Sequence, residues 1–249
     1  MNYALQILQL EKELMHKMQS SKKLEAGRIT IGIPSCYGAY ILPQVLPAFK
    51  RQFPQIDLQI IEESSDDLET RLEKGLIDFA IVNLPIHNKQ LLYETLLMDH
   101  VVLAIPNTLL QNELPTTYPL KASILLDTVC LQDYQHTPFL LLKPGHRVSY
   151  ISKKILEEEN IIPNIYLQSS SIDTLCEFCL LGQGITFVPQ TIAYKKFNYP
   201  NSPVSLFDLS GHPTDYSLVA LYHKKFPLTP SMKHFIHMVR TLHTASLDG

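Results

Sequence analysis

Residues 28–82, RITIGIPSCYGAYILPQVLPAFKRQFPQIDLQIIEESSDDLETRLEKGLIDFAIV, decide the fold. Three β-rich apolar runs stand in this stretch, at Arg28–Pro34, Asp57–Glu62 and Ile77–Val82. Two segments with helical spacing separate them, at Tyr40–Phe53 and Ser64–Lys74. Strands that alternate with helices are typical of a parallel sheet with right-handed crossover connections. The stretch therefore predicts an α/β lobe.

The strand–helix alternation continues toward the C-terminus. Two more strands are expected directly after this stretch, at Leu91–Leu97 and Val101–Ile105. Near Pro106 the pattern restarts, and the elements expected beyond it are strands at Pro138–Leu142, Ile165–Gln168, Ile185–Val188, Val204–Phe207 and Ser217–Tyr222 and helices at Ser149–Glu159, Ile172–Leu181 and Pro230–His243. Two similar α/β units in tandem predict two Rossmann-like lobes, 28–106 with 215–249 and 107–214. Because no Gly/Ser linker separates them, we expect crossing strands to join the lobes.

The N-terminal segment has helical periodicity. Its apolar stripe consists of Tyr3, Ile7, Leu10, Leu14 and Met18, and Gly27 stands where a C-terminal cap glycine belongs. The spacing suits a seam between two helices, although a helix packed on its own domain is the alternative. No partner helix follows in the next stretch, which favours pairing with another chain.

The bulk composition excludes several classes of protein. The chain has 249 residues, 45% of them hydrophobic and 18% charged, with a formal net charge of −3. Without a basic stripe to neutralise phosphates, the chain is not expected to read DNA itself. No apolar run reaches the roughly 20 residues that span a membrane, and the N-terminus does not resemble a secretory signal. We therefore expect a cytoplasmic protein, without contact to a membrane and without a disulfide framework among its four cysteines.

Several short motifs resemble those of the LysR-type bacterial transcription regulators. They are GRITIG at 27–32, ILP at 41–43, FP at 53–54, EESS at 62–65, GLIDFAI at 75–81 and GQGITFVP at 182–189. Their order and separations resemble the family over nearly the whole chain. The resemblance implies a fold like the type 2 periplasmic binding proteins, with two α/β lobes and an effector cleft between them.

The resemblance also carries expectations about the whole regulator. It implies that residues 1–26 are the remnant of a linker helix through which such regulators dimerise, in a homodimer or homotetramer. It implies a winged helix-turn-helix that precedes this helix and is absent from the chain. DNA contact is therefore expected only through that absent N-terminal domain.

Candidate effector-binding residues follow the strands, because open α/β sheets bind ligands beyond the carboxyl ends of their strands. In the first lobe the candidates are Pro34, Ser35, Cys36, Tyr37, Ser64, Ser65 and Asn83. Amide N–H groups and the partial positive charge of a helix N-terminus attract anions. The resemblance places the family's first-lobe contacts at 34–38. The alternative for each serine is an ordinary helix cap.

The second lobe offers a matching set of candidates. They are Lys143, His146, Gln168, Ser169, Ser170, Phe187 and Pro189. Three successive serines at 169–171 exceed what one helix cap requires. Lys143 and His146 offer positive charge, although a loop lysine is more often solvated, and Phe187 is more often a core residue. Hydroxyls beside helix N-termini favour a small anion, and we expect a metabolite that bears a carboxylate.

Other reactive side chains are expected to be structural. Cys176 and Cys179 form a C-x-x-C in the middle of a predicted helix, where core packing is expected. His234 and His237 lack a third ligand in the sequence pattern, so no metal and no cofactor are expected. Cys36 precedes a helix, which leaves a thiol-sensing role open for it.

The sequence favours a sensor over an enzyme. It contains no G-x-S-x-G turn, no phosphate loop and no H-E-x-x-H pair. We expect the effector to shift an existing conformational equilibrium that repositions the DNA-reading domains. A solute-binding protein, which would need export, and a small enzyme on the same two-lobe scaffold are the alternatives. A silent cleft, with lobe contacts that serve only oligomerisation, is a third.

Overall fold

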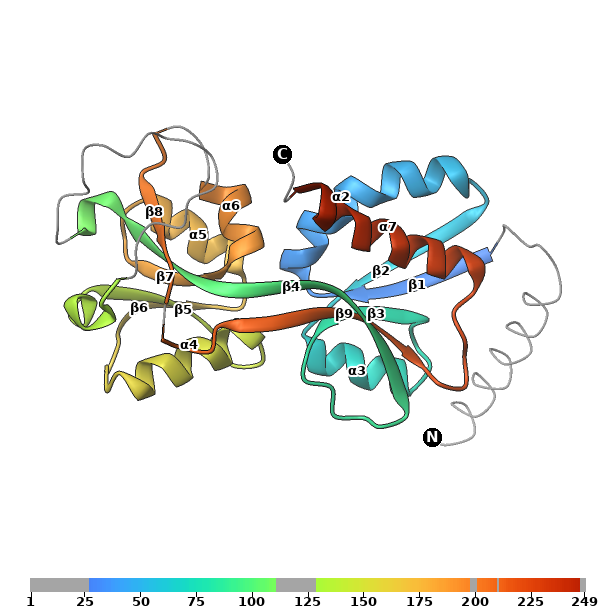
Figure 1. Cartoon of the computed structure of the whole chain (residues 1–249), viewed down its shortest axis with the longest axis horizontal. Coiled ribbons are helices and arrows are strands. Elements are labelled where there is room, and N and C mark those ends of the chain that lie inside the picture. Colours follow the sequence, from blue (N-terminus) through green and yellow to red (C-terminus); the bar gives the residue numbers. More distant parts are fainter. Residues whose placement is uncertain (1–26, 111–128, 198–200, 210, 247–249) are drawn as a thin grey trace. The chain divides into compact units, whose positions relative to one another are not determined.

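The computed structural model describes residues 27–110, 129–197, 201–209 and 211–246. The helix expected in the N-terminal segment, with its apolar stripe from Tyr3 to Met18, lies outside these residues. The chain divides into two compact units, of which the first comprises Met1–Met98 with Ser217–Gly249 and the second Asp99–Tyr216. Two strands, β4 (Leu91–Pro106) and β9 (Asp215–His223), contribute residues to both units (Figure 1).

The first unit is built on a mixed sheet with the order β2-β1-β3-β9-β4. Its further elements are β1 (Gly27–Ile33), α2 (Ser35–Gln52), β2 (Ile56–Glu62), α3 (Ser65–Glu73), β3 (Phe79–Asn83) and α7 (Pro230–Ser246). β1 pairs with β2 and with β3 in parallel, as the strand–helix alternation predicts. β9 pairs with β3 in antiparallel orientation.

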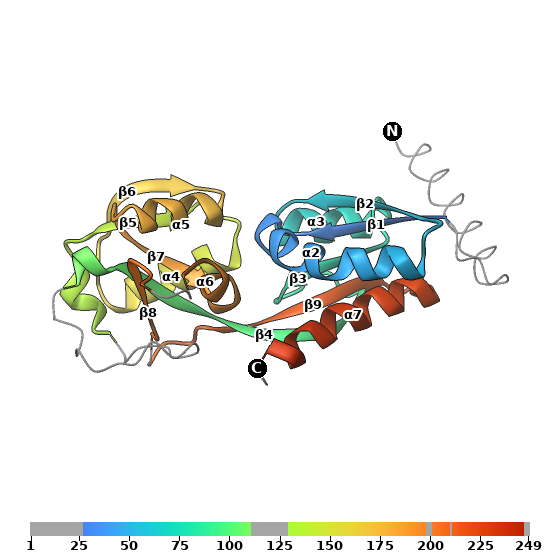
Figure 2. The ribbon, with the colours of Figure 1, turned by 90° about the horizontal axis from the view of Figure 1, so that it is seen from above.

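Helices cover both faces of this sheet. Phe79 of β3 contacts Phe235 of α7, which in turn contacts Phe49 of α2, with ring centroids 5.7 and 5.3 Å apart. On the other face, Leu68 and Leu72 of α3 pack against the β3 and β9 side chains. Figure 2 shows α2 and α7 side by side, and α3 across the sheet from them. The aromatic contacts fix the C-terminal helix to the first unit.

Helix α2 begins at Ser35, five residues before the helix expected from the sequence at Tyr40–Phe53. Its buried residues Tyr37, Ile41, Val45 and Phe49 recur every fourth position, so one apolar stripe runs from the first turn to the last. Pro43 and Pro47 lie inside the helix on its exposed side. Solvent can satisfy the backbone groups that a proline leaves without an intrahelical partner there.

The second unit carries its own sheet, in the order β4-β7-β5-β6, with β8 paired to β4. Its remaining elements are the 3-10 turns η1 (Asn107–Leu109) and η2 (Leu131–Tyr134), strands β5 (Pro138–Leu142), β6 (Asn164–Ser169), β7 (Ile185–Pro189) and β8 (Val204–Phe207), and helices α4 (Arg147–Glu158), α5 (Ile172–Leu180) and α6 (Gln190–Phe197). β5 is parallel to both β6 and β7, whereas β4 is antiparallel to β7.

One expectation about the strands was wrong, and one helix was missed. The strands expected at Leu91–Leu97 and Val101–Ile105 form one continuous strand, β4. The polar interruption at Asp99 does not end it, because the buried carboxylate accepts hydrogen bonds from the backbone N–H groups of His100 (2.9 Å) and Thr191 (3.3 Å). Helix α6, in which Thr191 is the second residue, was not expected at all.

One buried hydroxyl in the second unit has no hydrogen-bond partner among the described residues. It is Oγ1 of Thr186, a β7 residue that is 1% exposed. We expect Thr186→Val to raise the free energy of unfolding by about 1 kcal/mol, because a methyl group of the same shape has no lost hydrogen bond. Denaturant unfolding measures the change. Ser205→Ala is the control with the opposite sign, since Ser205 Oγ donates to Asn107 Oδ1 at 2.7 Å.

Candidate functional site

In the first unit, the sequence-predicted residues gather at one edge of the sheet. Because β1, β2 and β3 are parallel, the residues after Ile33, Glu62 and Asn83 lie at the same edge. This edge therefore holds the Pro34–Tyr37 segment, Ser64, Ser65 and Asn83. Ser35 is exposed, Cys36 is half-buried, and Pro34 and Tyr37 are buried.

The two serines of this edge have different roles. Ser64 caps α3: its Oγ accepts from the Asp67 backbone N–H (3.2 Å) and donates to the Asp67 carboxylate (2.6 Å). Ser65 Oγ accepts from the backbone N–H of Asn83 (3.3 Å), which ties the start of α3 to the end of β3. The capping alternative therefore accounts for Ser64, whereas Ser65 shapes the edge itself.

Asn83 has an unsatisfied polar atom at this edge. Its side-chain Oδ1 is buried and makes no hydrogen bond to the described residues. The segment after Asn83 passes through the cis peptide Leu84–Pro85 and is held by Glu69, whose carboxylate accepts from the backbone N–H of His87 (3.0 Å). A carboxamide can present a donor or an acceptor, so Asn83 is suited to hydroxyl groups.

The N-terminus of α2 differs from that of α3. No side chain caps α2 and its first turn holds no acid, whereas α3 has the Ser64 cap together with Asp66 and Asp67. An acid approaches α2 from another element, however. A Cβ added to Gly38 would lie 2.7 Å from Oε1 of Glu62, so this carboxylate lies against the first turn of α2. The sequence analysis missed Glu62, although its place at the end of β2 is a signal for it.

The second unit repeats the arrangement at the ends of β5, β6 and β7. Lys143 follows β5, and its backbone N–H donates to the carbonyl of Ser169 at the end of β6 (2.9 Å). Gln168 and Ser170 are exposed at this edge. Pro189 ends β7 and is buried. The parallel register therefore gathers most of the second-lobe candidates at one edge as well.

The three serines at 169–171 differ in the hydrogen bonds that they make. Ser171 caps α5 by accepting from the Thr174 backbone N–H (3.2 Å). Ser169 Oγ accepts from the backbone N–H of Ser171 (3.0 Å). Ser170 is exposed, and its hydroxyl makes no hydrogen bond within the described part of the chain. Ser170 is thus the serine whose hydroxyl remains available to a ligand.

Helix α4 begins among basic residues. Its N-cap is His146, no side chain caps it, and its first turn holds no acid. Burial lowers the pKa of His146, so its ring is neutral near pH 7 and does not supply the positive charge we expected. Lys143 is exposed.

Arg147 is a cation that the sequence analysis missed. It opens α4, its guanidinium lies 5.2 Å from the Tyr150 ring centroid, and its Nε is buried without a partner among the described residues. The helix dipole disfavours a cation at this position, so an arginine at the first position of a helix could have indicated a binding-site residue in the sequence.

Some sequence candidates lie in the core. Phe187 is 2% exposed, and its ring stacks on Phe139 with 6.4 Å between centroids. It is therefore a core residue and not part of the exposed edge. Cys176 and Cys179 are fully buried in α5, as core packing predicts. Burial raises the pKa of the Cys179 thiol, which keeps it protonated and unreactive.

The described residues include neither a metal-binding cluster nor a membrane-spanning helix. Across the described ranges, no three His, Cys, Asp or Glu side chains are grouped so that they could hold a metal ion. Within those ranges no helix has the length and hydropathy needed to cross a bilayer.

Known proteins match both the sequence and the fold. The family model described as "LysR substrate binding domain" matches residues 22–243. The chain belongs to this family. The HTH-type transcriptional regulator YcgK of Bacillus subtilis (strain 168) is 26% identical over 201 residues, which are 76% of this chain and 60% of YcgK. The chain spans about three fifths of the length of the curated regulators it matches.

Solved structures of an effector-binding domain and of a regulatory domain share the fold. The regulatory domain of Synechocystis PCC6803 CcmR, in complex with 2-PG, aligns with a TM-score of 0.69 at 15% identity, over 87% of this chain and 97% of that domain. The effector-binding domain of QuiR, in complex with shikimate, aligns with a TM-score of 0.65 at 16% identity, over 88% and 98%. The predicted α/β fold of the type 2 periplasmic binding proteins is confirmed.

Proposed function

We propose that this chain is the sensing part of a LysR-type transcription regulator and that it binds a small hydroxylated carboxylate without converting it. The relatives are named transcriptional regulators, and two solved relatives hold small molecules. DNA binding by a preceding winged helix-turn-helix, assembly as a homodimer or homotetramer, and a cytoplasmic location belong to the same proposal.

The N-terminus of α4 is the observation that carries the ligand class. α3 and α5 each have a serine cap and at least one acid in the first turn, so their partial positive charge is already offset. α4 has neither, and Lys143 and Arg147 add positive charge beside it. A carboxylate is the group that such an end attracts.

The edge of the first unit suits a different part of a ligand. Asn83 Oδ1 and the Glu62 carboxylate accept hydrogen bonds, and the Ser65–Asn83 hydrogen bond holds the edge in shape. Acceptors of this kind favour hydroxyl groups.

Thermal unfolding of the whole chain with small probes tests the ligand class. We expect shikimate, 2-PG or a related hydroxy acid to raise the Tm, whereas the matching amide or alcohol does not, because a ligand selective for the folded state stabilises it. At 100 times the Kd the gain is about 2.7 kcal/mol. If only neutral or cationic probes raise the Tm, the carboxylate assignment fails. Consumption of the probe would instead indicate an enzyme.

A bulky substitution at Ser170 tests the place of binding. We expect Ser170→Trp to weaken the stabilising hydroxy acid at least tenfold, about 1.4 kcal/mol, because the indole occupies the edge beside Lys143. Isothermal titration measures the Kd. Asn164→Trp is the matched control, since Asn164 is also exposed but begins β6, whereas Ser170 follows its end. Equal affinities of the two variants and the wild type would place the ligand elsewhere.

A further inference from the structure

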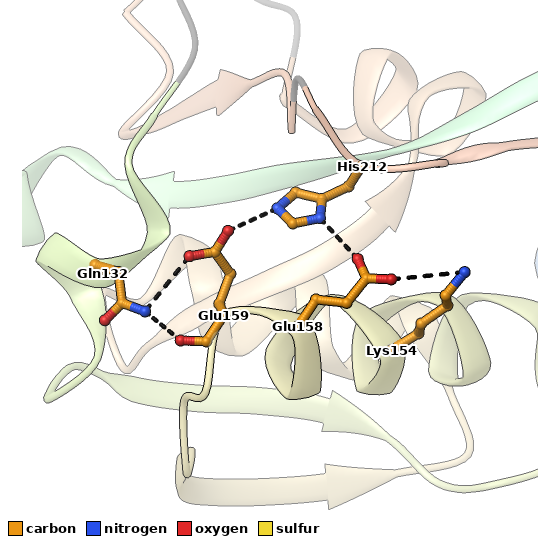
Figure 3. Close-up of polar contacts among 5 residues, drawn as sticks. All are labelled: Gln132, Lys154, Glu158, Glu159 and His212. Carbon is orange, nitrogen blue, oxygen red and sulfur yellow. Dashed lines mark hydrogen bonds and ion pairs between the residues drawn. The ribbon is translucent and has the colours of Figure 1, made fainter.

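A histidine lies between two carboxylates at the other end of α4. The Nδ1 atom of His212 is 3.1 Å from Oε2 of Glu158, and its Nε2 atom is 2.9 Å from Oε1 of Glu159 (Figure 3). The imidazole is largely buried, with 14% of its side chain exposed. His212 precedes β9, so the contact joins the chain that enters this strand to the end of α4.

The geometry sets the protonation state of the ring. An ionised carboxylate only accepts hydrogen bonds, and a neutral imidazole has a proton on one nitrogen only. Both contacts of His212 are therefore hydrogen bonds only when both ring nitrogens carry protons. In the neutral ring, one nitrogen presents its lone pair to a carboxylate, which repels it.

The C-terminal end of α4 carries negative charge that no basic residue of its last turn offsets. The last turn of α4 holds no basic residue, and Glu157, Glu158 and Glu159 follow one another where the helix dipole is negative. Lys154 pairs with Glu158 at 3.6 Å, one turn back along the helix. Protonated His212 offsets both the like-charge repulsion and the unfavourable dipole.

A third segment completes the cluster. Gln132 of η2 donates from Nε2 to the backbone carbonyl of Glu159 and, at 3.4 Å, to its carboxylate. This neutral amide holds Glu159 in place at the helix end, where the Glu159 backbone N–H donates to the carbonyl of Ile155. Glu159 is thus fixed from two sides before His212 contacts it.

We propose that His212 is a pH-sensitive strap of the second unit, which holds the Gly211–Thr214 segment to the end of α4 when the imidazole is protonated and releases one carboxylate when it is neutral. The strap goes beyond effector sensing and does not depend on the ligand. The charged groups that face it are Glu158, Glu159 and, behind Glu158, Lys154. Asp208 and Asp215 flank His212 on its own segment.

The strap depends on the protonation of both partners. The hydrogen bond from His212 lowers the pKa of Glu158 below its ordinary value, with a smaller contribution from Lys154. The stabilisation from Glu158 is therefore present above the ordinary carboxyl pKa and lost as the pH falls through the lowered one. On the alkaline side, the strap weakens when the ring gives up one of its two protons, because one nitrogen then presents a lone pair to a carboxylate. Histidine side chains in general change charge between pH 5 and 8.

Hydrogen exchange of the whole chain, wild type against His212→Gln at the same pH, tests the proposal. At pH 5.5 we expect the amides of Leu156–Ile161 and Gly211–Tyr216 to exchange about fivefold faster in the variant, the factor for one part-exposed ion pair. At pH 8 the ratio should approach one. A comparison at equal pH removes the intrinsic pH dependence of exchange.

Two further variants make the result decisive. Glu159→Gln, which keeps a hydrogen-bond acceptor but removes a charge, should also raise exchange at pH 5.5 more than at pH 8. His136→Gln removes an exposed histidine of the same unit and should leave both segments unchanged. A ratio that is equal at pH 5.5 and pH 8 in both His212→Gln and Glu159→Gln would overturn the strap and leave a structural contact.

Discussion

Replacing Phe235 with alanine should lower the free energy of unfolding of the first unit by about 3–5 kcal/mol. The ring is fully buried between Phe49 of α2 and Phe79 of β3, so truncation removes apolar contacts on two elements and leaves a cavity. Denaturant unfolding measures the loss. Hydrogen exchange should localise it to α2 and α7.

Phe53→Ala is the matched control for this change. Phe53 is half-buried at the end of α2 and contacts Phe49 and His234 at 4.9 and 5.4 Å between centroids. Because its ring already meets solvent, we expect less than half of the loss. If both variants lose the same amount, the C-terminal helix is not anchored through Phe235.

The second large effect is expected at Gly184, the residue directly before β7. A Cβ at this position would lie 2.5 Å from the carbonyl oxygen of Pro138 and 3.1 Å from Leu140 Cγ. Gly184→Ala therefore forces the backbones of β5 and β7 apart, and we expect the second unit to lose about 1–3 kcal/mol. Thermal unfolding combined with hydrogen exchange of β5 and β7 measures it.

Gly38→Ala is the control: it tests whether a close contact with a side chain costs as much stability as a close contact with the backbone. Its added Cβ would also come close to a neighbour, Oε1 of Glu62 at 2.7 Å, but that atom ends a flexible, exposed side chain. We expect little loss, or a small gain from the helix propensity of alanine. A drop comparable to that of Gly184→Ala would show that proximity alone does not predict the penalty.

The sequence predicts the elements whose periodicity is regular and misses those that depend on a tertiary partner. RITIGIP and IDFAIV have the β-rich composition of buried strands and lie within two residues of β1 and β3. β4 was divided because Asp99 is read as polar, and only the fold supplies the amides that satisfy its carboxylate. The first turn of α2 was missed because Tyr37 continues the apolar stripe only once the packing against the sheet is known.

The sequence predicts where the residues of the candidate site lie, but not which hydrogen bonds each side chain makes. Strand ends are visible in a sequence, so the residues at both edges could be named. The division of labour among the serines could not, because Ser64 and Ser171 are recognised as caps only from their hydrogen bonds. The environment of His146, where burial removes the charge, and the orientation of Arg147 also arise from packing.

The first unit is assembled from both ends of the chain, and this affects the order of events during synthesis. β9 lies between β3 and β4 in its sheet, yet Ser217 leaves the ribosome only after every residue of the second unit. Until then the growing chain exposes an open strand edge at β3, a surface prone to wrong pairing. The uninterrupted Asp99–Tyr216 run is available as a whole beforehand. In the cell, the second unit has the chance to mature before the first unit does.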